Sequence, residues 1–376
     1  MIYLDHNATT PPLPEVIDAM TPYIETHWAN TSSVYRFSSA SKNALNDSRR
    51  SVADCLNAPV DGVIFTSGAT ESINSAVHSA ILLNSNRRHI VTSVVEHSAT
   101  LGYCDYLEQF HGVEVTRLNV DASGQISLTE LASSIRPDTA LVSLIWANNE
   151  TGVILPVSEV SEICRKSGVP LHLDAVQAVG RIPVDFINTG AAFMSISAHK
   201  VGAVKGCGCL LVADPKSFQP FIRGGKQEGG KRGGTESIPL IVGFSKALEL
   251  TTGANLGECE RVLKLRESLE TELLKQHPTL QINGVASPRL PNTTSLHIPG
   301  VDNDAAVTYL DQKGICVSSG SACLESAIAP SHVILAMSNS HEVASETIRI
   351  SMGRETTERE VEVLLRELKG MIEVML

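Results

Sequence analysis

The feature that most constrains the fold is a series of short, almost continuously apolar segments separated by helical patterns. The clearest unit is GVIFTSGATESINSAVHSAILL, where an apolar strand ends near Thr66 and a turn of small residues leads into apolar side chains at helical spacing. Similar apolar runs occur in RHIVTSVVEHSA, TALVSLIWANNETG, VPLHLDAVQAVG, FMSISAHK and GCGCLLVA. Strands that are apolar on both faces and separated by helices predict an α/β fold with a mostly parallel sheet covered on both sides.

The length of 376 residues exceeds the usual size of one domain and predicts a second, smaller one. After about Leu250 the pattern changes to a long charged helix, ECERVLKLRESLETELLKQ, followed by shorter strand candidates in TTSLHIPG and ETIRISMG. The residues Thr-Glu-Arg-Glu from Thr357 onward predict a capping box that starts a last amphipathic helix. This α+β pattern is the candidate second domain.

Composition argues against several classes of partner. The chain carries 41 acidic and 30 basic residues, a formal charge of -11, and it has no long basic run. A nucleic-acid surface or an anionic membrane is therefore not expected to be its main partner. The start, MIYLDHNATT, lacks the basic and apolar regions of a secretory signal, and no segment approaches the ~18 apolar residues of a membrane span. We predict a cytoplasmic protein without direct contact to membranes or nucleic acid.

The eight cysteines are spread along the chain rather than clustered as in a disulfide scaffold. Without a secretory signal, reduced thiols are the expectation. Cys207 and Cys209 form a CGC motif, but no second Cys or His pair stands nearby at zinc spacing. We therefore predict no metal site.

Polar residues follow several of the expected strands, at the edge where open α/β sheets bind ligands. Ser67 to Thr70 lie between a strand and a helix start, where free N–H groups and the helix dipole favour an anion. Asp174 follows the apolar PLHL, where a carboxylate needs a cation or a strong donor, unless it serves as a helix N-cap. Lys200 ends FMSISAHK, where desolvation can make the amine a nucleophile, although an isolated lysine after a strand is more often simply solvated.

These residues are more informative as a set with His97, which ends VTSVVEH. An anion turn, a buried aspartate, a lysine and an imidazole meet the needs of pyridoxal phosphate: a phosphate cradle, a partner for the pyridinium nitrogen, a Schiff-base lysine and a ring for stacking. A dinucleotide site is the rival interpretation. The sequence has no G-x-G-x-x-G between a first strand and a helix, and no Walker-type phosphate loop.

Several motifs together resemble those of the NifS/IscS-type cysteine desulfurases, in order and in approximate spacing, over nearly the whole chain. They are YLDHNATTP, FTSGATES, the pair Glu96-His97, NNETG, HLDAVQAVG, SISAHK, GGTES, SSGSAC and IRISMGR. The resemblance implies the fold of class V aminotransferases, which is the PLP-dependent transferase (aspartate aminotransferase-like) fold, and a homodimer. It also implies a large cofactor-binding domain over 15–252 and a small domain formed by 1–14 and 253–376, with a mobile cysteine loop at about 318–330.

The resemblance further implies roles for individual residues. Lys200 would hold pyridoxal phosphate as a Schiff base, Asp174 would keep the pyridine nitrogen protonated, and His97 would stack on the ring and help move protons. Gln177 would hydrogen-bond the phenolic oxygen of the ring. The implied phosphate ligands are Ala69, Thr70, Ser197 and His199, with Thr235 of the partner subunit, and the implied ligands of the substrate carboxylate are Asn149, Arg349 and, nearby, Asn30.

Cys323, the last residue of SSGSAC, would be the sulfur acceptor. In the implied reaction its thiolate attacks the sulfur of L-cysteine, which leaves L-alanine and a persulfide on the enzyme. Small flanking residues suit a loop that approaches the cofactor and then carries sulfur outward. The acceptor would be another protein: an iron-sulfur scaffold, a thiolation protein or a DNA sulfur-modification protein, among which the sequence does not choose.

Three positions depart from the family pattern. Tyr35 stands where histidine is common, Gly202 where tyrosine is common, and Lys226 where glycine is common. None of them removes a residue expected to contact the cofactor. Two other functions stay open. A selenocysteine lyase, or another PLP-dependent lyase or aminotransferase of this fold, need not depend on a sulfur-accepting cysteine. A non-catalytic scaffold of a sulfur system would have no need of the intact lysine, aspartate, histidine and cysteine.

Overall fold

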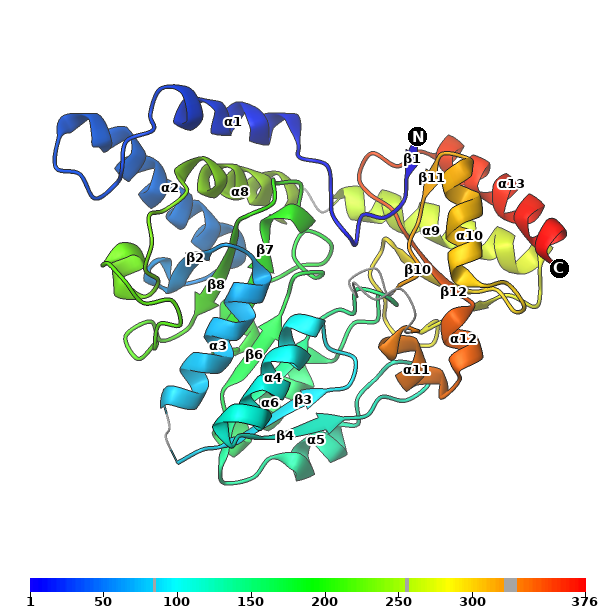
Figure 1. The fold of residues 1–376 in the computed structure, drawn as a ribbon, viewed down its shortest axis with the longest axis horizontal. Coiled ribbons are helices and arrows are strands. Elements are labelled where there is room, and N and C mark those ends of the chain that lie inside the picture. Colours follow the sequence, from blue (N-terminus) through cyan, green and yellow to red (C-terminus); the bar gives the residue numbers. More distant parts are fainter. Residues whose placement is uncertain (84–85, 254–256, 321–329) are drawn as a thin grey trace.

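The computed structural model describes residues 1–83, 86–253, 257–320 and 330–376. A seven-stranded sheet forms the centre of the larger of two lobes (Figure 1). The strand order is β2 (Val63–Thr66), β8 (Gly208–Val212), β7 (Phe193–Ser197), β6 (Leu171–Asp174), β5 (Thr139–Ile145), β3 (His89–Ser93) and β4 (Glu114–Leu118). Six of these strands coincide with apolar runs singled out in the sequence.

The sheet is mostly parallel, as the sequence predicts. β8 is the exception and runs antiparallel to both β2 and β7. Residues 198–207, which connect β7 to β8, contain no α-helix, and a parallel pair needs a long crossover connection that they do not supply. β4 at the sheet edge was not predicted, because its sequence, EVTRL, is largely half-exposed and lacks the continuous apolar character of the other strands.

Both faces of the sheet are buried, which explains why its strands are apolar at successive positions. Side chains alternate between two apolar layers, so that Phe65 packs in one layer and Ile64 in the other. One layer includes side chains of α1 (Pro14–Glu25), α2 (Ser39–Leu56), α6 (Val157–Ser167) and α8 (Ile238–Thr251), and the opposite layer those of α3 (Ala69–Leu83) and α4 (Ser98–His111). Two short helices, α5 (Leu128–Ser134) and α7 (Phe186–Thr189), complete this lobe.

The smaller lobe has its own apolar core. Its antiparallel sheet has the order β12 (Thr347–Ser351), β10 (Thr293–His297) and β9 (Gln281–Ile282), and a parallel pair joins β1 (Ile2–Tyr3) to β11 (Ile315–Cys316). The helices are α9 (Gly257–Gln276), α10 (Asn303–Gln312), α11 (His332–Ser338), α12 (His341–Ser345) and α13 (Glu358–Met375). No helix within the described ranges has the length and apolarity needed to cross a membrane.

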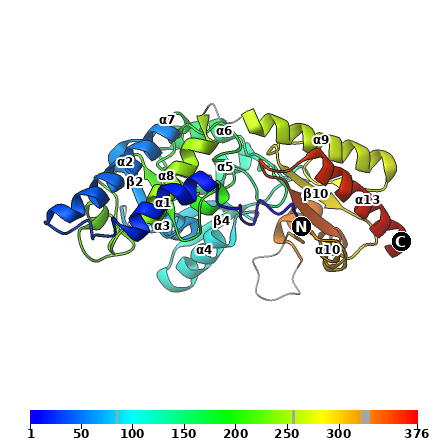
Figure 2. The same cartoon turned by 90° about the horizontal axis from the view of Figure 1, so that it is seen from above.

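The chain begins in the smaller lobe and then crosses to the larger one. Leu4 is buried in the core of the smaller lobe, whereas Leu13 is buried in the core around the seven-stranded sheet. Figure 2, which views the molecule from above, shows this N-terminal segment passing between the two lobes. Residues 5–12 are therefore positioned to contact groups from both lobes.

The capping box predicted at Thr357 is present. The Thr357 hydroxyl accepts a hydrogen bond from the Glu360 N–H at 3.3 Å, and the Glu360 carboxylate accepts one from the Thr357 N–H at 2.9 Å. These bonds satisfy N–H groups that the first turn of α13 otherwise leaves without partners.

We expect Thr357→Ala to lower the free energy of unfolding by about 1 kcal/mol, because the cap hydroxyl is lost. Chemical denaturation followed by circular dichroism measures the change. Thr357→Ser keeps the hydroxyl and should stay close to wild type. Equal stability of the alanine variant and wild type would show that the cap contributes nothing to α13.

Candidate active site

A cavity of about 810 Å³ lies where the two lobes meet. Asp174 and Lys200 of the larger lobe line it, as do Gly320 and Arg349 of the smaller lobe. Ten of the residues proposed from the sequence line this one cavity: Ala69, Thr70, His97, Asn149, Asp174, Gln177, Ser197, His199, Lys200 and Arg349. Since parallel strands direct their carboxyl ends to one edge, the seven-stranded sheet brings the segments of the larger lobe together, and β12 of the smaller lobe adds Arg349.

The turn between β2 and α3 forms one end of the cavity. Ala69 and Thr70 are the first residues of α3, so their N–H groups belong to the helix start, where an anion is favoured. The Glu71 carboxylate holds the turn by accepting hydrogen bonds from the Ser67 N–H at 2.9 Å and the Ser67 hydroxyl at 2.6 Å. Arg232 pairs with the other oxygen of Glu71 at 2.9 Å. This end suits a phosphate group.

A glycine in β8 allows this turn to lie against the sheet. A Cβ atom at Gly208 would be 2.6 Å from the Ile196 carbonyl oxygen and 2.9 Å from the Gly68 Cα. Any side chain at this position would therefore displace either β7 or the anion turn. The close approach explains the glycine between the two buried cysteines of the CGC motif, Cys207 and Cys209.

Asp174, the last residue of β6, is buried and lines the cavity. Burial raises its pKa to about 6, against the opposing effects of a hydrogen bond from the Val176 N–H at 3.0 Å and the charge of Lys200. A carboxylate in this state gains stability from a cationic N–H donor. The protonated nitrogen of a pyridine ring is such a donor.

His97 lies beyond the end of β3 and caps α4. Its Nδ1 accepts a hydrogen bond from the Ala99 N–H at 3.1 Å, which assigns the ring proton of the neutral form to Nε2. Burial lowers the pKa of His97, and the charges of Lys200 and His332 lower it further. The ring is therefore neutral near pH 7 and can lie against a planar ligand.

Gln177 carries a buried polar atom that no hydrogen bond satisfies within the described part of the chain. Its Nε2 donates to the Asn7 carbonyl oxygen at 3.0 Å, whereas its Oε1 has no partner there. An unsatisfied buried acceptor is costly unless a ligand or a water donates to it. The hydroxyl of a pyridoxal ring is a suitable donor.

Lys200 lies in the 3-10 turn Ala198–Lys200 that follows β7. Its amine donates to the carbonyl oxygens of Asn7 at 2.5 Å and of Ala8 at 2.7 Å. The neighbouring His199 contacts the Thr9 hydroxyl through Nδ1 at 3.1 Å, and burial lowers its pKa to about 4 with help from nearby cations. The N-terminal segment thus fixes both side chains at the cavity.

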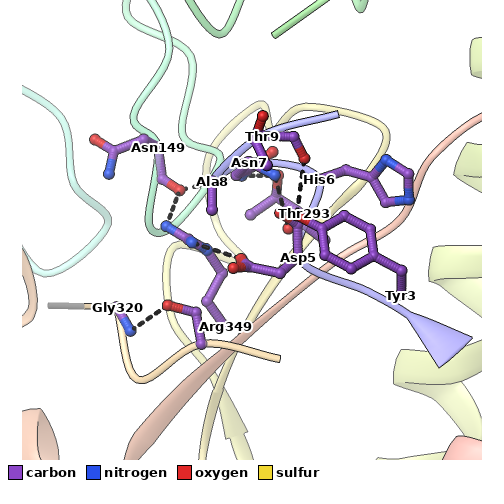
Figure 3. A network of polar contacts seen from close by, with 12 residues as sticks. Tyr3, Asp5, His6, Asn7, Ala8, Thr9, Asn149, Thr293, Gly320 and Arg349 are labelled. Atoms are coloured by element: carbon purple, nitrogen blue, oxygen red, sulfur yellow. Dashed lines mark hydrogen bonds and ion pairs between the residues drawn. The ribbon is translucent and has the colours of Figure 1, made fainter. Parts of the chain in front are cut away.

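Arg349, on β12, supplies the cationic group of the smaller lobe. Its Nη2 pairs with Asp5 at 2.7 Å, and its Nη1 donates to the Asn149 carbonyl oxygen at 3.1 Å (Figure 3). Its Nε is buried without a hydrogen-bond partner among the described residues. Figure 3 also shows the side-chain amide of Asn149 directed away from the guanidinium. Arginine's forked donors suit a carboxylate ligand.

Two residues proposed from the sequence are not brought to the cavity of their own chain. Asn30 and Thr235 are exposed and are not among the described residues that line it. Their segments lie next to each other, because the Thr31 hydroxyl donates to the Glu236 carboxylate at 2.7 Å. Cys323 and most of the expected cysteine loop lie outside the described residues.

The departures from the family pattern have different surroundings. Gly202 has a φ of +86°, and a Cβ atom there would be 2.8 Å from the Leu13 Cγ. A tyrosine would therefore be strained at this position and would displace Leu13. Tyr35 is exposed, and Lys226 lines a surface hollow away from the cavity. None of the three changes the cavity wall.

Asp5, which pairs with Arg349, and Asn7, which lines the cavity, were not proposed from the sequence, although both lie within the YLDHNATTP motif. Their contacts are with residues more than 100 positions away in the sequence, which local patterns do not reveal. Glu150, Ser331 and His332 also line the cavity and were not proposed.

Comparisons with known proteins agree with this architecture. The family model described as Aminotransferase class-V matches residues 2–364. A cysteine desulfurase of Cereibacter sphaeroides is 42% identical over 373 residues, which is 99% of this chain and 96% of the relative. Among solved structures, a NifS-like protein superposes with a TM-score of 0.92 at 32% identity and 99% coverage of both chains. SspA, solved in complex with cysteine, gives a TM-score of 0.83 at 31% identity and covers 95% of this chain and 100% of its own. The fold class expected from the sequence is thereby confirmed, and the chain belongs to the class-V aminotransferase family.

Proposed function

We propose that this protein is a cysteine desulfurase that uses pyridoxal phosphate to convert L-cysteine to L-alanine and transfers the sulfur through Cys323 to an acceptor protein. The observation that carries the proposal is the cavity between the lobes, where the buried Asp174, the amine of Lys200 and the guanidinium of Arg349 occur together. The full-length similarity to cysteine desulfurases, and the cysteine complex of SspA, support cysteine as the substrate.

The residues present fit pyridoxal phosphate. Asp174 suits the protonated ring nitrogen, the unsatisfied Gln177 oxygen suits the ring hydroxyl, and His97 offers a neutral ring for stacking. The proposed phosphate ligands at the start of α3 and the end of β7 are Ala69, Thr70, Ser197 and His199. When bound, pyridoxal phosphate supplies an electron sink that weakens the bonds at the Cα of an amino acid.

Different side chains of this protein would then have different roles in the reaction. Arg349 and Asn149 bind and orient the substrate carboxylate. Lys200 binds the cofactor and moves the proton at the substrate Cα, and His97 assists with proton transfer. The Cys323 thiolate attacks the substrate sulfur, so that an S–S bond forms as the C–S bond breaks. The substrate Cβ keeps the electron pair of the broken C–S bond and takes up a proton. The net products are alanine and a Cys323 persulfide, with no external oxidant or reductant.

We further propose a cytoplasmic homodimer in which Thr235 of the partner subunit completes the phosphate site. Its support is the exposed position of this residue, outside the cavity of its own chain. Two large apolar side chains in the segment around Asn30 are also exposed: Trp28 at 68% and Val34 at 98%. Exposed apolar groups of this kind are typical of surfaces covered by another protein.

We expect Cys323→Ala to bind pyridoxal phosphate normally but to lose alanine production from cysteine by about a hundredfold or more, since the thiol that receives sulfur is absent. Cofactor absorbance, an alanine assay and mass spectrometry of the persulfide test this. Cys316→Ala, which changes a half-buried thiol on β11, is the control and should keep its activity.

Full cysteine turnover by Cys323→Ala would contradict the proposed sulfur transfer. Retained activity that is restricted to selenocysteine would favour a selenocysteine lyase. Absence of cofactor binding and of turnover in the wild-type protein would favour a non-catalytic scaffold.

From the raised pKa of Asp174 we predict how the free energy of unfolding of the cofactor-free protein depends on pH. Because the folded state binds the Asp174 proton more tightly than the unfolded state, this residue's contribution to stability falls as pH rises from about 4 to about 6. Asp174→Asn has no such titration. The free energy of unfolding of Asp174→Asn minus that of wild type should therefore rise by on the order of 2 kcal/mol between about pH 4 and about pH 6, and then level off.

Urea denaturation at a series of pH values measures this difference. Pyridoxal phosphate should then stabilise wild type more than Asp174→Asn, because the variant offers no charge to the ring nitrogen. A stability difference that does not change with pH would contradict the burial argument.

A further inference from the structure

The guanidinium of Arg349 is already paired with a carboxylate before any substrate is considered. The Asp5 carboxylate accepts a hydrogen bond from Nη2 at 2.7 Å. The side chain of Asp5 is only 17% exposed and that of Arg349 only 5%. The Asn149 carbonyl oxygen accepts from Nη1 at 3.1 Å. Figure 3 shows both contacts converging on the guanidinium. Two of its three nitrogens thus have fixed partners, and Asp5 supplies the charge that compensates the buried cation.

Asp5 is itself held by a rigid backbone. The Leu4 N–H donates to the Cys316 carbonyl oxygen at 2.9 Å, and the Leu4 carbonyl oxygen accepts from the Ser351 N–H at 2.7 Å. On the other side of Asp5, the His6 N–H donates to the Ser351 carbonyl oxygen at 3.1 Å. The segment around Asp5 therefore pairs both with β11 and with the end of β12, the strand that carries the arginine.

The backbone of Arg349 is equally well fixed. Its N–H donates to the Ser318 carbonyl oxygen at 2.6 Å, and its carbonyl oxygen accepts from the Ser318 N–H at 3.1 Å. The long side chain is the part that retains rotational freedom, and ordering an arginine side chain costs up to about 2 kcal/mol. The Asp5 contact orders the guanidinium before the substrate arrives.

We propose that Asp5 is a positioning residue of the substrate-carboxylate site. It holds Arg349 so that the remaining N–H groups of the guanidinium are presented to the carboxylate of the amino-acid substrate. This inference rests on the proposed function and assigns a role to a residue of the N-terminal segment. The competing interpretation is that Asp5 occupies the arginine and opposes substrate binding, in which case its removal would tighten binding.

The test compares Asp5→Ala with Asp5→Asn in the full-length holoenzyme. The amide of Asp5→Asn still accepts a hydrogen bond from Nη2, whereas Asp5→Ala releases the guanidinium. Glu270→Ala is a matched control, because Glu270 pairs with Arg289 at 2.7 Å in a buried ion pair that does not line the cavity. It separates a loss of stability, measured by urea denaturation, from a loss of carboxylate recognition.

Two ligands show how much the substrate carboxylate contributes to binding. L-alanine carries both an amine and a carboxylate, whereas cysteamine carries the amine and the thiol but no carboxylate. Their equilibrium binding is followed by the change in cofactor absorbance, independently of turnover. If Asp5 acts through Arg349, its removal should weaken the binding of L-alanine and leave the binding of cysteamine unchanged.

For Asp5→Ala we expect the KM for cysteine and the Kd for L-alanine to rise about tenfold, with kcat within about threefold of wild type. Asp5→Asn should stay close to wild type, and Glu270→Ala should lose stability without a change in KM. Should Asp5→Ala fail to fold, Asp5→Ser takes its place, since its shorter side chain does not reach Nη2.

Unchanged or tighter L-alanine binding by Asp5→Ala would overturn the proposal, as would equal weakening of L-alanine and cysteamine. The failure of the proposed function gives a different result. If wild type binds the cofactor but makes no alanine from cysteine, the comparison of L-alanine with cysteamine still decides the role of Asp5. If wild type binds no cofactor, no amino-acid site forms beside Arg349, and the proposal for Asp5 is overturned as well.

Discussion

The hydrogen bonds of Asn7 are the interaction on which the rest of the site depends. This buried residue uses every polar group that it has. Its carbonyl oxygen accepts hydrogen bonds from Lys200 and Gln177. Its side-chain amide donates to the Asn149 carbonyl oxygen and the Thr293 hydroxyl, and its side-chain oxygen accepts from Asn292. Its backbone N–H donates to the Ser351 hydroxyl. One residue at the crossing between the lobes therefore connects the proposed cofactor ligands to the arginine side of the cavity.

The electrostatics of the cavity explain why such an arrangement needs ligands. Burial disfavours the charged forms of three residues that line the cavity: the pKa of Asp174 is raised, and the pKa values of His97 and His199 are lowered. The Asp174 shift costs stability near neutral pH in the protein without ligand, whereas the two histidine shifts cost stability only at acid pH. A cationic ring nitrogen beside Asp174 and a carboxylate beside Arg349 would return part of that free energy as binding, which is why perturbed groups gathered in one cavity are typical of functional sites.

Much of the fold could be predicted because its main signals are local. Strands buried on both faces are apolar at consecutive positions, and the capping box at Thr357 is encoded within four residues. The edge strand β4 escaped prediction because its side chains are mixed in polarity. The direction of β8 escaped because pairing depends on a connection rather than on the strand itself. The domain boundaries proposed from the sequence stay predictions, although the two apolar cores lie on either side of the N-terminal crossing.

The residues that line the candidate cavity could be predicted where polar residues follow strands, as at Asp174 and Lys200. Contacts between distant parts of the sequence, such as that of Asp5 with Arg349, could not. Cys323, the residue on which sulfur transfer depends, stays a prediction. The central claim, that one cavity joins a cofactor site to a carboxylate site, is tested most directly by a crystal structure of the protein with pyridoxal phosphate and L-alanine. We expect the ring nitrogen within hydrogen-bond distance of Asp174 and the alanine carboxylate on Arg349. A cofactor bound elsewhere, or a carboxylate that does not contact Arg349, would contradict the account.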